Sequence, residues 1–292
     1  MIHPSTFSIV AYSPKEEAWG VAVASKFLAV GAFVPWAQAG VGAVATQSYV
    51  NTTFGPHGLE LMANGLSAQE VLDRLISEDK GHASRQVGLV DAHGGSAAYT
   101  GSGCYAWAGH LTGRYFACQG NILVSAETVQ AMAHTFEHTT GELADRLVAA
   151  LAAGEKAGGD SRGRQAAAVL VVKPKGGYGG FNDRYLDLRV DDDQQPVQRL
   201  QALLKLHHLY FGKSEPEAQI KIEGTLAKEI QQLLIHLGYL SGLPSGVYDE
   251  ATRAAFEAFT GTENLEERCQ IAEGKIDPPA LEYIRQHFRT RS

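Results

Sequence analysis

The order of the predicted secondary-structure elements is the feature that most constrains the fold of this chain. Runs typical of strands come in groups of two and three, and segments with helical periodicity come in pairs. A doubly wound parallel sheet would require strict alternation of strand and helix, which this order lacks. The order instead favours an α+β fold in which helix pairs cover antiparallel sheets.

The elements fall in the first two thirds of the chain. Strands are predicted at residues 7–12, 18–24, 41–47, 85–91, 96–100, 114–119, 166–173 and 185–190, and helices at 127–138, 142–153 and 196–210. Two more helices lie between residues 47 and 85, and Ser67 with Glu70 forms a capping box at the start of the second. The runs 87–90 and 169–172 are apolar on both faces, as in sheets covered on both sides. We therefore expect two sheets inside and helices outside.

Glycine usage indicates two domains. Of the 32 glycines, 25 precede Gly212, and the region after it is rich in Leu, Glu and Gln. Gly212 and Pro216 stand close together, and both residue types stop helices. We predict a domain over residues 1–211, a linker over 212–223 and a helical domain over 224–292.

Composition excludes several classes of protein. The net charge of −7 argues against a general nucleic-acid binder, which would need a basic face. No apolar run reaches the ~18 residues of a membrane span, and residues 1–12 lack the basic start of a secretory signal. Three widely spaced cysteines fit reduced thiols. We expect a cytoplasmic protein that binds neither nucleic acid nor membrane.

Thr6 lies at the start of the first predicted strand. A hydroxyl is a poor nucleophile without a base, and an N-terminal α-amine can act as the base for its own residue. The alternative reading is that threonine stands there only for its β propensity. Spacing alone leaves this alternative open.

Further segments show a resemblance to a known family. The resemblance is carried by residues 6–11, 19–27, 30–32, 34–37, 39–47, 55–59, 85–88, 107–110, 119–123, 158–165 and 188–192 and covers about residues 6–205. On these segments the chain resembles the N-terminal-nucleophile (Ntn) hydrolase superfamily and, more specifically, a bacterial family called domain of unknown function 1028.

The resemblance implies a four-layer αββα sandwich and amide-bond hydrolysis. Thr6 would be the nucleophile, its freed α-amine the base, and Lys26 a cation that keeps this amine unprotonated. Backbone N–H groups near Gly120 and Asn121, or the Asn121 side chain, would stabilise the oxyanion.

Other polar residues are candidates for tuning the site or binding substrate. Asp160 could orient the site together with Arg162 and Arg164, although a solvated turn explains the same residues. Further substrate-binding candidates follow predicted strands and could equally be ordinary strand-end residues; they are Ser25, Thr46, Gln47 and Asn51.

The resemblance has one departure, at the N-terminus. Residues 1–5 precede Thr6, so an Ntn mechanism requires cleavage of the bond between Ser5 and Thr6. Three alternatives remain open: regulated cleavage, an inactive form, or a fold that has lost the chemistry.

We expect no metal and no cofactor. Residues 134–138 match the H-x-x-E-H zinc signature, but the apolar stripe of this helix leaves His134, Glu137 and His138 facing solvent. Residues 191–193 are three aspartates before a helix that begins with proline. Complementing the helix dipole explains them, with a cation site as the alternative.

The C-terminal region resembles small three-helix peptidoglycan-binding-like domains. The spacing of Leu and Ile over residues 226–237 predicts an amphipathic helix, and a second helix starts at Asp249. Tyr239 and Tyr248 would line a binding groove. The alternative is a packing or dimerisation module without affinity for glycan.

These observations lead to one leading functional hypothesis. The chain would be an Ntn-type amidohydrolase that cleaves an amide bond in a small peptide or a cell-wall-derived substrate, with a homo-oligomer as a further expectation. The alternative is a non-catalytic protein that binds peptidoglycan fragments or a partner through its C-terminal domain.

Overall fold

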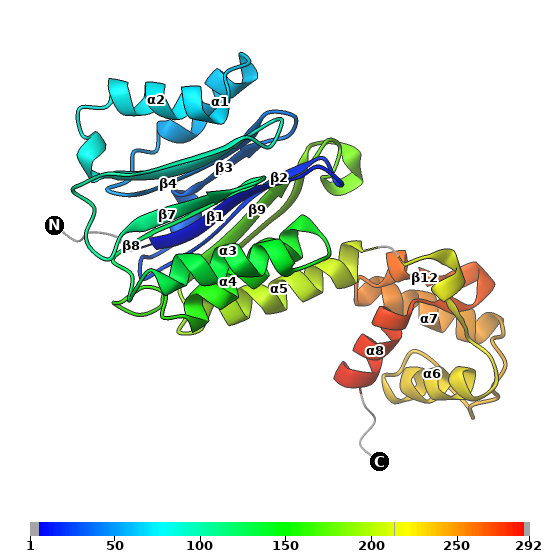
Figure 1. Ribbon diagram of the computed structural model, residues 1–292. Helices are drawn as coiled ribbons and strands as arrows, with labels where there is room; N and C mark the ends of the chain where they lie inside the picture. The colour runs from blue at the N-terminus through cyan, green and yellow to red at the C-terminus, as the bar shows by residue number, and fades with distance from the viewer. Residues whose placement is uncertain (1–5, 213, 289–292) are drawn as a thin grey trace. The chain divides into compact units, whose positions relative to one another are not determined.

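The computed structural model describes residues 6–212 and 214–288 and divides into two compact units (Figure 1). The division falls between Leu204 and Lys205, inside helix α5 (Pro196–Phe211). The region predicted as a linker, 212–223, contains a 3₁₀ turn and strand β11 (Ile220–Lys221), which pairs with β13 (Lys275–Ile276). Part of that region therefore belongs to the fold of the second unit.

Two antiparallel sheets form the centre of the first unit. The larger sheet has the strand order β10-β9-β2-β1-β8-β7, and the smaller has the order β3-β4-β5-β6. The bounds of the larger sheet are β1 (Thr6–Ser13), β2 (Ala18–Ser25), β7 (Gly109–Gly113), β8 (Phe116–Asn121), β9 (Ala166–Val172) and β10 (Arg184–Val190). Those of the smaller sheet are β3 (Pro35–Gln38), β4 (Gly42–Ser48), β5 (Arg85–Asp91) and β6 (Ser96–Thr100). The predicted hairpin of β1 and β2 is present, with Phe7 opposite Ala24.

Helices cover the outer face of each sheet (Figure 1). Helices α1 (Phe54–Ala63) and α2 (Ala68–Glu78) pack on the smaller sheet, and the predicted capping box starts α2. Helices α3 (Glu127–His138), α4 (Leu143–Lys156) and the first part of α5 pack on the larger sheet. Side chains of β1 alternate, so that Ile9 meets the helices and Val10 meets the other sheet. The first unit is therefore an α+β structure of four layers.

Close packing of α1 on β3 depends on Gly55. A Cβ atom at this position would lie 2.2 Å from ring carbons of Trp36. We expect Gly55→Ala to lower the free energy of unfolding of the first unit by about 1–3 kcal/mol because the ring must move. Chemical denaturation measures this loss. In a Trp36→Ala background the same substitution should cost much less, and an equal cost in both backgrounds would contradict the assigned clash.

The second unit is mainly helical, as expected. Helices α6 (Gly224–His236), α7 (Glu250–Thr262) and α8 (Pro278–His287) enclose a core that includes Phe256 and Phe259. The structure adds a small sheet in which β13 lies between β11 and β12 (Cys269–Gln270), so the prediction of an all-α domain was wrong in this detail. Short pairings of two residues carry no alternating apolar pattern, which explains why the sequence did not predict them.

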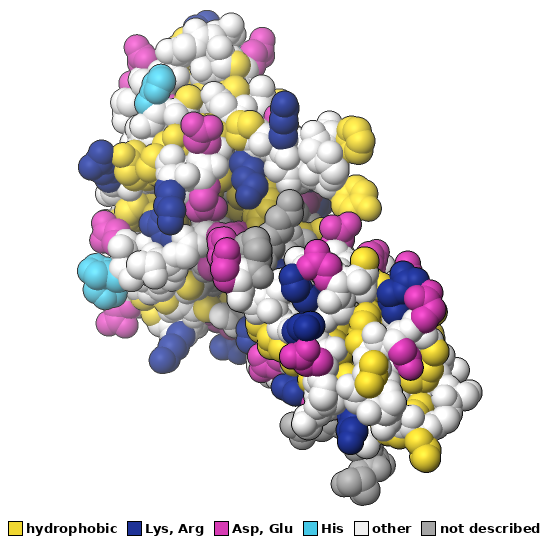
Figure 2. Space-filling view, turned by 90° about the vertical axis from the view of Figure 1, so that its right-hand side faces the viewer, with side chains coloured by type: hydrophobic (Ala, Val, Ile, Leu, Met, Phe, Trp, Pro, Cys, Tyr) yellow, Lys and Arg dark blue, Asp and Glu magenta, His cyan; other side chains and the backbone are white. Residues whose placement is uncertain are grey.

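The lengths of the helices concern membrane insertion, and the distribution of surface charge concerns nucleic-acid binding. In the described part of the chain, every helix is too short or too polar to cross a bilayer. On the face shown in Figure 2, acidic and basic side chains are interspersed, without a large area of one sign.

Candidate functional site

Three polar side chains meet at one end of the larger sheet. Thr6 begins β1, Ser25 ends β2 and Asn121 ends β8, and the antiparallel register places Asn121 opposite Thr6. The Oγ1 atom of Thr6 and the Oγ atom of Ser25 are 3.2 Å apart. Thr6 has the same parity as Val10 on β1, so its side chain lies between the sheets. All three residues are buried.

The facing sheet contributes Gln47, from β4, to the same place. Its Nε2 atom donates a hydrogen bond of 3.2 Å to the carbonyl oxygen of Thr6. Its Oε1 atom accepts one of 2.6 Å from the hydroxyl of Ser8. Gln47 therefore joins the two sheets at the start of β1.

Gln86, on β5, extends this network toward Asn121. Gln86 Oε1 accepts hydrogen bonds from Gln47 Nε2 (2.8 Å) and Asn121 Nδ2 (2.9 Å). Gln86 Nε2 donates to the carbonyl oxygen of Gly120 over 2.7 Å. The side chain of Gln86 is fully buried, so it fixes both the backbone and the side chain at the end of β8.

Gln119, on β8, completes the network of hydrogen bonds between the two sheets. Its Nε2 atom donates to Ser8 Oγ over 2.6 Å, while its buried Oε1 atom has no hydrogen-bond partner in the described part of the chain. A Cβ atom at Gly88 would lie 2.1 Å from this Oε1, so glycine makes room for the amide. Ser8, Gln86 and Gln119 were not predicted as site residues from the sequence; their signal is a polar residue on a strand that is otherwise apolar on both faces.

The backbone turns sharply after two of these residues. Ser48 follows Gln47 with φ of 67°, and Ile122 follows Asn121 with φ of 51°. A positive φ is costly for a β-branched residue such as isoleucine. The carbonyl of Tyr105 accepts from Ile122 N (2.9 Å) and Ser161 donates to the carbonyl of Ile122, which holds this conformation. Strained residues of this kind concentrate at functional sites.

Lys26 and Asp160 have structural partners of their own. The Asp160 carboxylate accepts from the backbone N of Lys26 (2.7 Å) and pairs with the Arg162 guanidinium at 3.1 Å. The Lys26 amine donates to the carbonyl oxygen of Arg164 over 3.2 Å. Among the described residues, no hydrogen bond joins Lys26 to Thr6. Asp160 thus fastens the turn before β9 to the end of β2.

A small cavity of about 70 Å³ lies beside the end of β2. Ser25, Glu155 and Arg164 are among the residues that line it, and Arg164 Nε lies 3.5 Å from Glu155 Oε1. Burial raises the pKa of Glu155, and the charge of Arg164 opposes this rise. The cavity connects the surroundings of Ser25 with charged groups.

Thr46 and Asn51 belong to a different cluster. Thr46 Oγ1 donates to the carbonyl oxygen of Asn51 over 3.2 Å, and Asn51 Nδ2 donates to Asp79. Asp79 pairs in turn with Arg85 at 2.7 Å, which lowers the pKa of the Asp79 carboxyl. Neighbouring residues of a strand face opposite sides, so Thr46 points away from the space into which Gln47 points.

The two tyrosines predicted to bind substrate lie in the second unit. Tyr239 packs edge-on against Phe259, with ring centroids 5.8 Å apart. Tyr248 donates from its hydroxyl to the carbonyl oxygen of Ile271 over 3.0 Å, and burial raises its pKa to about 12. Both rings therefore also stabilise the core of that unit.

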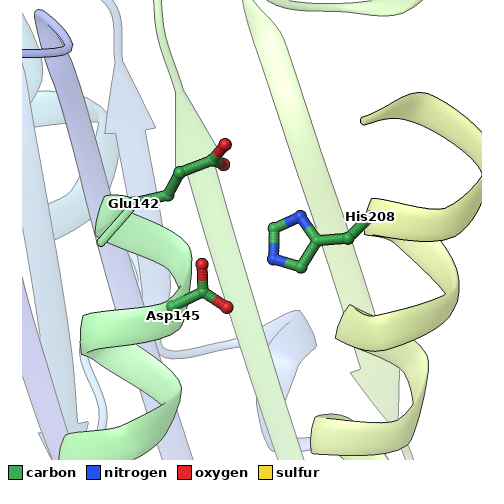
Figure 3. A group of neighbouring side chains, drawn as sticks. All are labelled: Glu142, Asp145 and His208. Carbon is green, nitrogen blue, oxygen red and sulfur yellow. The ribbon is translucent and has the colours of Figure 1, made fainter. Parts of the chain in front are cut away.

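Candidate metal ligands lie on α3, at the start of α4 and on α5. On α3, His138 Nδ1 lies 2.8 Å from the carbonyl oxygen of His134 one turn earlier, and both histidines are exposed. Glu142 and Asp145 lie at the start of α4, and His208, on α5, belongs to the second unit (Figure 3). Glu142 Oε2 accepts a hydrogen bond of 2.7 Å from the Tyr185 hydroxyl. The pKa of Tyr185 is raised mainly by burial and also by this hydrogen bond. Glu142 therefore ties α4 to β10.

Comparisons with known proteins identify relatives of both units. Residues 6–200 match the family model described as a family of unknown function (DUF1028), and residues 210–284 match one described as "Putative peptidoglycan binding domain". The crystal structure of protein SPO2555 from Silicibacter pomeroyi, described with the DUF1028 family, is similar at a TM-score of 0.65 and 30% identity. The similarity covers 71% of this chain and 91% of that one. No curated protein matches the chain.

Proposed function

The chain belongs to the family of unknown function DUF1028, and from the geometry at the start of β1 we propose that its first unit is an Ntn-type amide hydrolase with Thr6 as nucleophile. In this proposal the four layers are the αββα sandwich of Ntn hydrolases. The substrate is an amide bond in a small peptide or a cell-wall-derived molecule.

One observation carries the proposal. The Thr6 hydroxyl lies at the first residue of β1, between the two sheets, 3.2 Å from Ser25 Oγ and opposite Asn121. The side chains around it are neutral amides and hydroxyls, from Ser8, Gln47, Gln86 and Asn121. Within the described residues, no ionisable side chain hydrogen-bonds the Thr6 hydroxyl, so its own α-amine is the base that the site can offer.

The reaction then has two steps. After cleavage of the Ser5–Thr6 bond, the Thr6 amine accepts the hydroxyl proton while Oγ1 attacks the carbonyl carbon of the substrate. The amine returns the proton to the leaving nitrogen, which departs as an amine and leaves an ester on Thr6. Water hydrolyses this ester and restores the hydroxyl. The Asn121 amide, held by Gln86, or the backbone N–H groups at Gly120 and Asn121 would stabilise the oxyanion.

Lys26 has a smaller part in this proposal than the resemblance implied. Its amine donates to the carbonyl oxygen of Arg164, so we do not assign it an effect on the protonation of the Thr6 amine. The bond to be cleaved precedes Thr6, and residues 1–5 lie outside the described residues.

A second candidate function rests on the match of residues 210–284 to a peptidoglycan-binding domain. In this alternative the first unit is a scaffold, and the second unit binds peptidoglycan fragments. Leu243 and Val247, in the segment between α6 and α7, are strongly exposed and could contact such a ligand. The second unit could also deliver wall fragments to a catalytic first unit.

The intact mass of protein produced without an N-terminal tag tests the hydrolase proposal. We expect a mass that lacks residues 1–5, because only an exposed Thr6 amine can serve as base. The processed protein should release free amine from a panel of small amides and muropeptides, as detected by ninhydrin or mass spectrometry. A full-length mass that persists on long incubation, with no amine released, would exclude the proposal for this protein.

A further inference from the structure

A second, larger pocket lies on the first unit at the start of α5. It has a volume of about 670 Å³ and is lined by Lys26, Arg164, Asp192, Asp193, Gln194 and Gln195. Pockets that hold small ligands usually have volumes of about 300–1,000 Å³. Most ligand pockets are apolar, whereas here every lining side chain is charged or carries an amide.

Within the described residues, the two cations of this pocket have donors without a partner. Lys26 Nζ makes one hydrogen bond there, to the Arg164 carbonyl, and an ammonium group has three donors. The Arg164 guanidinium meets Glu155 through Nε at 3.5 Å. In the part of the chain that the structure describes, its terminal nitrogens form no further ion pair.

Each of the two carboxylates accepts hydrogen bonds through only one of its oxygens in the described part of the chain. Asp192 Oδ1 accepts from Gln165 Nε2 over 3.0 Å, and Asp193 Oδ1 accepts from the backbone N of Gln195 over 2.7 Å. The second oxygen of each carboxylate makes no hydrogen bond within residues 6–212 and 214–288. These contacts hold both side chains at the rim of the pocket and leave one acceptor on each.

The opposite charges line one pocket without pairing with each other. Among the described residues, neither cation has an ion pair with Asp192 or Asp193, so the charged groups lie more than 4.0 Å apart. A ligand with a single charge would satisfy one pair of groups and meet like charge at the other. A ligand that carries one charge of each sign can satisfy both pairs with charge-assisted hydrogen bonds.

We propose that this pocket binds a zwitterion, a molecule with one ammonium and one carboxylate group. Its carboxylate would bind Lys26 and Arg164, and its ammonium would bind Asp192 and Asp193. A free amino acid and a short peptide with both ends free share this chemistry.

The position of the pocket relates it to the candidate catalytic site. Ser25 contacts the Thr6 hydroxyl, and the next residue, Lys26, lines the pocket. Arg164 lines both this pocket and the small cavity beside Ser25. If Thr6 is the nucleophile, the pocket receives the charged end of the substrate or the amino acid released. Binding of the zwitterion itself does not rest on the proposed function.

Isothermal titration of the full chain tests the proposal, and it needs no catalysis. The probes are L-alanine, D-alanine and L-alanyl-L-alanine, with N-acetyl-L-alanine and L-alanine amide as matched ligands that lack one charge. We expect at least one zwitterion to bind about 10-fold or more tightly than both single-charge analogues, because each analogue loses one set of charged contacts. The comparison of alanine with the dipeptide shows which source of the chemistry fits.

Variants assign the binding to this pocket. Lys26→Ala and Asp192→Asn should each weaken zwitterion binding about 10-fold. Lys15→Ala, in the exposed β1–β2 turn, and Asp73→Asn, on the exposed face of α2, are the matched controls and should bind normally. Equal binding of the single-charge analogues, unchanged binding by both pocket variants, or no zwitterion binding below a Kd of about 10 mM would overturn the proposal. Zwitterion binding by a protein that keeps residues 1–5 and releases no amine from the amide panel would retain the pocket and reject the hydrolase.

Discussion

Replacing Thr6 with alanine in the processed protein is expected to reduce the proposed amide hydrolysis by about 10⁴-fold or more, as loss of a covalent nucleophile does in known hydrolases. The substitution removes the Oγ1 atom that would attack the substrate, together with one hydrogen bond to Ser25. Turnover of an amide identified in the substrate panel, compared at equal concentrations of processed protein, measures the effect.

Two further variants make this result specific. Thr6→Ser keeps a hydroxyl in place and should retain a measurable part of the activity, because the amine remains beside it. Thr112→Ala removes a hydroxyl from the exposed edge strand of the same sheet and should leave turnover unchanged. If the Thr6→Ala protein is processed and still hydrolyses the amide at the normal rate, Thr6 is not the nucleophile.

The arrangement of strands and helices was largely predictable because each element carries a local pattern. The β-rich runs of β1 and β2 and the short turn between them predict a hairpin, and the structure has it with Phe7 opposite Ala24. The capping box at Ser67 and Glu70 is likewise a local signal, and both of its hydrogen bonds are present. Elements without a local pattern, such as the short strand β12, were missed.

The candidate site was predictable only in part, since it depends on which strands become neighbours. Thr6, Ser25, Gln47 and Asn121 were all named as candidates from the sequence, and in the structure they lie together although they come from four different strands. Thr46 does not join them, although it is the neighbour of Gln47, because strand parity turns it to the other face of β4. The sequence alone does not show which face of β4 points inward. A polar residue near the end of this strand that faces the site, such as Gln47, therefore cannot be distinguished from one that faces away, such as Thr46.

The buried amides show why the interior partners were missed. An isolated glutamine on an apolar strand gives no indication of its hydrogen-bond partner. The partners of Gln86 include residues of β4 and β8, which are distant from it in the sequence. A buried amide in such a network is costly without a partner, and Gln119 Oε1 lacks one in the described part of the chain. Through its other hydrogen bonds the network joins strands of both sheets. It therefore specifies how the two sheets register against each other, and it places Asn121 where the proposed reaction needs it.

Gln86→Leu tests this role, and we expect it to lower the free energy of unfolding of the first unit by about 3–6 kcal/mol. Leucine has similar volume, but it leaves Asn121 Nδ2 and the carbonyl of Gly120 without their bonds to Gln86 in a buried place. Chemical denaturation followed by intrinsic fluorescence measures the loss. The same substitution at Gln69, exposed on α2, is the matched control and should change stability by less than about 0.5 kcal/mol. Equal stability of the two variants would show that the network does not hold the sheets together. A folded Gln86→Leu protein should also hydrolyse amides more slowly than the Gln69→Leu protein, because Asn121 loses the partner that orients its amide.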